Sequence, residues 1–176
     1  MNKKLLVWIG ALVVLVVLGG YAYHTLGGFN KPEFEVKEAP AFYMLGRPYQ
    51  GILADKAFGD LFNEAEKLKA EKFPDGLVAG YFYNETKKGT DTIKAFVGLL
   101  FEKPVAPIQD YSILKIDERK VVEVTVNAHF LVAPANIYDK LKEFGKEQNL
   151  SVEVSPALEI YPKERQFVIQ VPVVQK

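Results

Sequence analysis

The chain begins with an uncharged and strongly apolar run. Residues 5–23 follow Lys3 and Lys4, and residues 12–18 within this run are all Leu or Val. As a helix, the run would rise about 28 Å, close to the thickness of a hydrocarbon core. Trp8, Tyr21 and Tyr23 lie toward its two ends, where amphipathic rings favour the membrane interface. We therefore predict a transmembrane anchor over residues 1–26, in contact with the lipid bilayer through residues 5–23.

The flanks of this run predict its orientation. Lys3, Lys4 and the terminal amine precede it, whereas Lys31 is the one Lys or Arg between residues 24 and 35. The positive-inside rule then places the N-terminus in the cytoplasm and exports the rest to the periplasmic or extracellular side. The alternative is a signal peptide cleaved near Gly20-Tyr21-Ala22, a small-x-small site.

Beyond a linker at residues 27–33, the pattern predicts one domain over residues 34–176. A strand at residues 41–45 leads through a glycine-bounded turn at residues 46–51 into a helix at residues 55–72, with Asp55 as a plausible N-cap. One face of this helix is apolar and includes Ala57 and Phe62. Strands at residues 77–83 and 93–101 follow, joined by a polar hairpin at residues 87–90.

The same order recurs in the second half. Strands at residues 111–116 and 121–127 precede a helix that begins near Pro134, and strands at residues 157–161 and 167–173 close the chain. The two copies align loosely, with Phe62 against Leu141 and Tyr83 against Tyr161. The predicted fold class is α+β: two strand-helix-strand-strand repeats form an antiparallel sheet with two helices on one face. The other face would be concave and open between the copies, a suitable place for a ligand.

Composition narrows the possible functions. Apolar residues make up 49% and charged residues 25% of the 176 residues, as in globular proteins. Lys plus Arg and Asp plus Glu both total 22, which argues against a nucleic-acid partner. The chain has no Cys, which excludes thiol catalysis and disulfides. His129 is the one histidine outside the anchor region, so no metal site, cofactor or catalytic triad is expected.

Aromatic and acidic residues in the predicted strands are the candidates for ligand binding. Glu123 and Glu159 each fall inside a strand, where charge is depleted. Alternation places Tyr81 with Tyr83, and Glu159 with Tyr161, on common faces. The predicted ligand-binding residues are Tyr43, Tyr81, Tyr83, Glu159 and Tyr161. The alternatives are that the carboxylates face solvent and that some of the tyrosines belong to the core.

Four segments resemble the GyrI-like, effector-binding domain family in their order and spacing. They are FYMLGRPYQG at residues 42–51, GYFY at residues 80–83, PALEIY at residues 156–161 and IQVPV at residues 169–173. The resemblance implies that residues 34–176 are a GyrI-like ligand-binding domain with a cleft between two repeats. Members bind small, often cationic or aromatic molecules; some are fused to transcription regulators, one type inhibits DNA gyrase and a few hydrolyse electrophilic toxins.

The chain departs from that family pattern in its last strand. Ligand-binding members have a glutamate a few residues before the Pro-Val, whereas Gln166 to Gln170 contain no carboxylate here. The combination of a membrane segment with this domain also resembles the testis-expressed, single-pass ER-phagy receptor of animals. That receptor has a long acidic tail with an autophagy-protein-binding motif, which this sequence lacks, so the receptor role is not expected.

The hypothesis from the sequence is a membrane-anchored binding module without catalytic residues. Its partner would be a small apolar or aromatic ligand or a protein segment. The alternative is a hydrolase of small electrophilic compounds that uses Glu123 or Glu159 with a tyrosine. A third possibility is an interaction domain whose cleft is filled by its own side chains.

Overall fold

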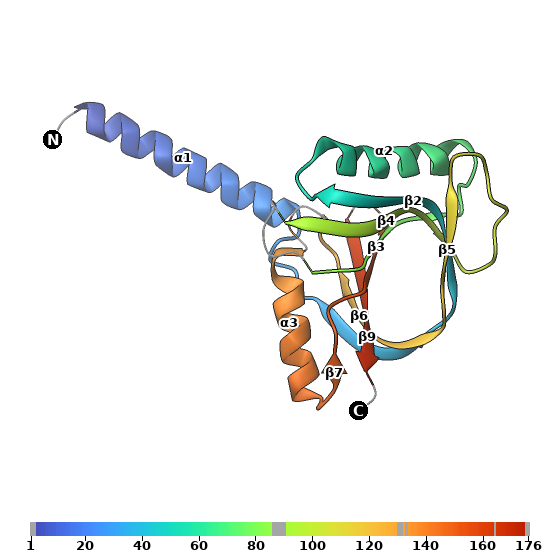
Figure 1. Cartoon of the computed structure of the whole chain (residues 1–176). Coiled ribbons are helices and arrows are strands. Elements are labelled where there is room, and N and C mark those ends of the chain that lie inside the picture. Colours follow the sequence, from blue (N-terminus) through green and yellow to red (C-terminus); the bar gives the residue numbers. More distant parts are fainter. Residues whose placement is uncertain (1–2, 86–90, 130–131, 133, 164, 175–176) are drawn as a thin grey trace.

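A long helix and a compact α+β domain make up the computed structural model (Figure 1), which describes residues 3–85, 91–129, 132, 134–163 and 165–174. The helix α1 (Lys3–Thr25) protrudes from the domain and is exposed along its apolar length. Within the described residues it is the single helix long and apolar enough to cross a membrane. This agrees with the predicted anchor at the level of length and composition.

Nine strands are described, and eight of them follow one another across a curved antiparallel sheet in the order β1-β6-β9-β8-β3-β4-β2-β5. Their bounds are β1 Glu33–Ala39, β2 Phe42–Ile52, β3 Leu77–Phe82, β4 Thr92–Phe101, β5 Ser112–Ile116, β6 Arg119–Val126, β8 Ala157–Lys163 and β9 Gln166–Val174. The short β7 (Ser151–Val152) pairs with the end of β9. The central pair, β3 and β8, joins the two repeats.

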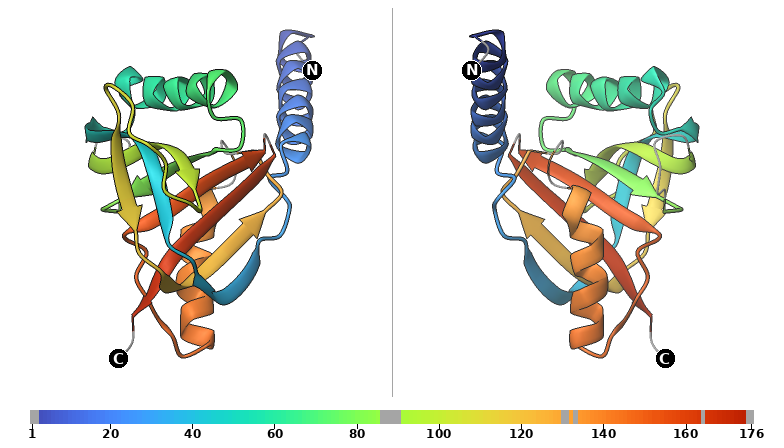
Figure 2. Two further views of the ribbon diagram at one scale, coloured as in Figure 1. Left: turned by 90° about the vertical axis from the view of Figure 1, so that its right-hand side faces the viewer. Right: turned by 90° about the vertical axis from the view of Figure 1, so that its left-hand side faces the viewer.

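The two domain helices, α2 (Lys56–Glu71) and α3 (Pro134–Glu147), pack on the same face of this sheet, as predicted (Figure 2). Phe58, Ala65 and Leu68 of α2 are buried. Asp55 takes the N-cap position but makes no side-chain capping hydrogen bond. The antiparallel sheet with both helices on one face confirms the predicted α+β fold class.

The opposite face of the sheet is not the open cleft that the sequence pattern suggested. Two residues, Asp117 and Glu118, connect β5 at one end of the sheet to β6 near the other. So short a connection requires the sheet to curl until its two ends meet. The interior of the curl is filled by a core cluster that includes Met44, Phe96 and Leu158.

Other differences concern strand lengths and one helical residue. Residues 46–51, expected to form a turn, continue β2 and pair with β4, and β1 is an additional strand. Gly46 and Gly98 face each other there, and a Cβ on Gly46 would lie 2.1 Å from the Val97 carbonyl oxygen. Ala57 is exposed. The predicted hairpin at residues 87–90 lies outside the described residues.

Candidate functional site: a pocket between the two helices

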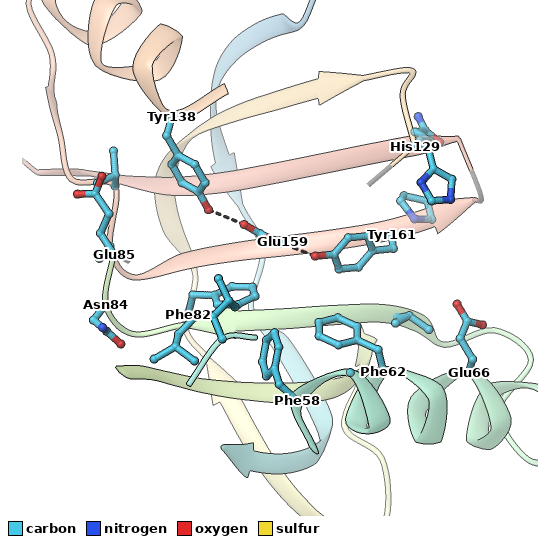
Figure 3. A pocket seen from close by; sticks show the side chains of 18 of the residues that line it. Phe58, Phe62, Glu66, Phe82, Asn84, Glu85, His129, Tyr138, Glu159 and Tyr161 are labelled. Atoms are coloured by element: carbon cyan, nitrogen blue, oxygen red, sulfur yellow. Dashed lines mark hydrogen bonds between the residues drawn. The ribbon is translucent and has the colours of Figure 1, made fainter. Parts of the chain in front are cut away.

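A large cavity lies on the helix-covered face of the sheet, between α2 and α3. It has a volume of about 1370 Å³. Strands β3 and β8 form its floor, α2 forms one wall and α3 contributes Tyr138 to the other (Figure 3). The two helices lie over different halves of the curved sheet, and the pocket lies between them (Figure 1).

Glu159 of β8 is the carboxylate at the floor of the pocket. Its side chain is buried, with the residue only 8% exposed. The hydroxyl of Tyr138 donates a hydrogen bond of 2.5 Å to Oε1, and the hydroxyl of Tyr161 donates one of 2.7 Å to Oε2. Gly80 is its register partner on β3, and the missing side chain there leaves room for the rings of Phe62 and Phe82.

Burial has the largest effect on the pKa values of Glu159, Tyr138 and Tyr161. It raises the pKa of the Glu159 carboxyl, and the two tyrosine hydroxyls oppose that rise because they stabilise the ionised form. Burial and the neighbouring carboxylate raise the pKa of both Tyr138 and Tyr161, so both phenols stay protonated and act as donors. The pocket floor thus presents a desolvated carboxyl group that gains from a cation or a hydrogen-bond donor.

The stability of the domain should therefore fall as pH rises above the ordinary carboxyl pKa of 4.5. Between that value and the raised value in the folded state, the folded protein retains a proton that the unfolded chain releases, and unfolding is favoured as pH increases. Urea unfolding of the fragment 31–176 at a series of pH values from 5 to 8 measures this slope. Glu159→Gln should flatten it, and an unchanged slope in that variant would assign the dependence to another group.

Aromatic rings form the wall of the pocket beside Glu159. Phe62 meets Tyr161 edge-on at 5.6 Å between ring centroids, and Phe58 meets Phe62 edge-on at 5.4 Å. Phe82 completes the series at 6.2 Å from Phe58. Such rings offer a large apolar contact area and favour flat ligands.

The rim of the pocket is polar and contains both signs of charge. At one end, Lys142 of α3 forms an ion pair of 3.0 Å with Glu85, which follows β3. His129 lies at the opposite end (Figure 3). Within the described ranges, no three His, Asp or Glu side chains gather as a metal site would require.

Of the five predicted site residues, the structure brings Glu159 and Tyr161 to the pocket. Tyr81 pairs in register with Leu158 and packs against the core cluster on the other face of the sheet. Tyr83 is 45% exposed and meets Tyr81 edge-on at 5.1 Å. Tyr43 also lies outside the pocket lining. The expectation of a common groove for the tyrosines of β3 and β8 is therefore corrected.

The reason is that the offset between the two repeats differs by one residue from the offset that matches Tyr83 with Tyr161. The spacing that relates Phe62 to Leu141 relates Phe82, and not Tyr83, to Tyr161. A shift of one residue along a strand moves a side chain to the opposite face. Phe82 does line the pocket, so a consistent spacing in the sequence would have found it.

Glu123, the second candidate carboxylate, is also on the opposite face. It accepts hydrogen bonds from the Lys37 ammonium at 2.6 Å and from the Gln170 side chain at 2.8 Å. Arg119 in turn donates to Gln170 at 3.2 Å. This network joins β1, β6 and β9, and it does not reach the pocket.

Tyr138 of α3 lines the pocket and is not among the site residues predicted from the sequence. Its hydroxyl reaches Glu159 across the pocket. Phe62, predicted on the apolar face of the helix, is only half-buried because one side of its ring faces the pocket.

Comparison with known proteins identifies the fold. The C-terminal domain of EcmrR has a TM-score of 0.62 at 12% identity, over 82% of this chain and 99% of that one. A Listeria innocua protein described as a hydrolase has a TM-score of 0.56 at 11% identity, over 82% of this chain and 93% of that one. No protein-family model and no curated protein sequence matches the chain.

These similarities support the effector-binding resemblance at the level of the fold. They do not show the resemblance to the ER-phagy receptor. A third similar structure is EcmrR in a complex with DNA, with a TM-score of 0.61 at 14% identity, over 98% of this chain and 69% of that one. The fold therefore does not support the exclusion of nucleic acid, which rests only on the balanced charge of this chain.

Proposed function

We propose that the protein is a membrane-tethered binding module for a small apolar or aromatic compound that presents an amine or another hydrogen-bond donor to Glu159. The observation that supports this most directly is the buried carboxyl group at the end of an aromatic wall. The last-strand glutamate of related domains is absent, but Glu159 supplies a carboxylate from β8 instead. A bound amine would offset the cost of desolvating that carboxylate.

Hydrolysis of an electrophilic compound is the alternative function. It would require Glu159 to activate a water molecule or attack the substrate. Both of its oxygens already accept hydrogen bonds from tyrosine hydroxyls, which lowers their nucleophilicity. This geometry favours binding over hydrolysis.

The binding proposal can be tested with 1-aminoanthracene, a flat fluorescent amine, and the full chain in phosphatidylcholine nanodiscs. We expect saturable fluorescence enhancement above that of empty nanodiscs, with no chemical turnover of the probe. Phe62→Ala should weaken the affinity about tenfold, because it removes one wall of the pocket and about 1–2 kcal/mol of aromatic contact. Glu159→Gln should weaken it as well.

Tyr83→Ala is the matched control, since it removes an aromatic ring of similar size on the other face of the sheet. It should leave the affinity within about twofold. The thermal stability of each variant must be measured alongside, with Phe62→Leu as a milder change. Equal loss in the Phe62 and Tyr83 variants, or no saturable binding, would contradict the proposed site.

Anchoring and orientation also belong to this proposal. We infer that α1 crosses a bilayer with its N-terminus in the cytoplasm, so that residues 34–176 act as an exported domain. Its apolar length and the clustering of Lys3 and Lys4 on one flank support this inference. A protein segment in place of a small molecule is the other possible occupant of the pocket.

A further inference from the structure

The anchor and the domain are joined without a free linker. Helix α1 ends at Thr25, and the carbonyl oxygen of the next residue, Leu26, accepts a hydrogen bond of 2.8 Å from the backbone N–H of His129. The Asn30 side-chain amide donates to the Asn127 carbonyl oxygen. The expected linker is therefore docked on the end of β6.

The turn at this junction is fixed by close contacts. Gly27 has a φ of +78°, and a Cβ there would lie 2.4 Å from the carbonyl oxygen of Asn127. The Tyr23 ring covers Gly28 and meets Phe29 edge-on at 4.9 Å. Because glycine alone allows this approach, α1 leaves the domain in a set direction.

With α1 across a bilayer as proposed, this junction brings one end of the pocket rim toward the membrane surface. Tyr21 and Phe29 are each 69% exposed at the domain end of α1, where aromatic rings mark the interface of a bilayer. His129, whose backbone N–H donates a hydrogen bond to Leu26, lines the pocket. Figure 1 shows α1 leaving on the side of the domain that carries α3, and in the right-hand view of Figure 2 α1 stands to one side of both α2 and α3.

The two ends of the pocket also differ. The end remote from His129 is bridged by the ion pair between Lys142 and Glu85 (Figure 3). The His129 end adjoins the anchor. In the proposed orientation, a compound dissolved in the outer leaflet would reach the pocket first at its His129 end, and its apolar part would pass from lipid to the aromatic wall.

We propose that the pocket exchanges its ligand directly with the bilayer, and that the ligand is a membrane-partitioned amphiphile with an amine or similar donor that reaches Glu159. This rests on the proposed binding function and adds the source of the ligand. Direct exchange avoids exposing the apolar part of the ligand to water, which costs about 0.8 kcal/mol per CH₂. Release into lipid is then faster than release into water.

The test uses the full chain in phosphatidylcholine vesicles and an anthracene-labelled dodecylamine as the probe. The pocket is preloaded, an excess of unlabelled dodecylamine is added, and displacement is followed by stopped-flow fluorescence. A Gly-Ser segment of about twelve residues inserted between Thr25 and Leu26 releases the contacts of Tyr23 but keeps those of Leu26 and Asn30 with the end of β6. It separates the rim from the bilayer by about 20 Å. We expect displacement to slow about tenfold, with equilibrium affinity changed less than twofold.

The same segment inserted between Ala106 and Pro107, in the loop between β4 and β5, is the matched control. It should leave the displacement rate unchanged. Normal affinity with an unchanged rate in the Thr25 variant would overturn direct exchange and leave the binding function intact. Equal slowing by both insertions would also overturn it, since distance from the bilayer would not be the cause. Absence of specific binding in the unmodified chain would overturn the binding function itself.

Discussion

Replacing Leu141 by alanine is expected to lower the free energy of unfolding of the fragment 31–176 by about 2–5 kcal/mol. Leu141 is fully buried in the core cluster that joins α3 to β6 and β9 and that also contains Ile137, Phe167 and Ile169. Removing its side chain leaves a cavity that these neighbours cannot collapse into. The four core clusters contain no residue of α1, so urea unfolding of this fragment is a suitable measurement.

Two further substitutions make the result specific. Ile113→Ala on β5 changes a side chain that is 37% exposed and should cost about 1 kcal/mol or less. Phe62→Ala is the equivalent change in the first repeat, and its cost should lie between the other two because Phe62 lines the pocket. A cost for Leu141→Ala below that of Phe62→Ala would mean that the pocket, rather than the α3 interface, contains the stabilising contacts.

A reporter enzyme fused to the C-terminus should be either active or inactive, depending on the orientation of α1 in the membrane. A phosphatase that needs disulfides to be active, fused after Lys176, should be active because the domain is exported to an oxidising compartment. The strand β9 ends at an exposed residue, Val174, so the fusion should not disturb the core. Activity is compared with that of the same fusion to a chain lacking residues 1–26, which should be inactive.

Charge exchange on the two flanks of α1 tests whether the flanking charges set its orientation in the membrane. Lys3→Glu combined with Lys4→Glu should reduce the active fraction, because it removes the positive flank that resists translocation. Lys31→Glu, on the other flank, should not reduce it. Phosphatase activity that is absent from the unmodified fusion, or that is indifferent to the Lys3 and Lys4 exchange, would contradict the proposed orientation.

The sequence by itself determined the elements that depend on local pattern. The apolar run of α1 needs no partner to be recognised, since its length and composition are sufficient. The helix at residues 56–71 follows from its apolar spacing and from Asp55, and the strand pairs at each end of the repeats follow from alternation. Glu159 was also a candidate binding residue from its place in a predicted strand, but the sequence left open whether its carboxylate faces solvent.

Only the tertiary structure decided which face of the sheet holds the pocket. The face depends on the register between β3 and β8, which pairs Gly80 with Glu159 and sends Tyr81 and Tyr83 to the other side. It depends also on the two-residue connection between β5 and β6, which curls the sheet and fills the face that the pattern left open. Register and curvature arise from contacts between residues far apart in the chain, and no local pattern records them. For the same reason, the reach of Tyr138 to Glu159 and the docking of Leu26 on His129 appear only when the chain is folded.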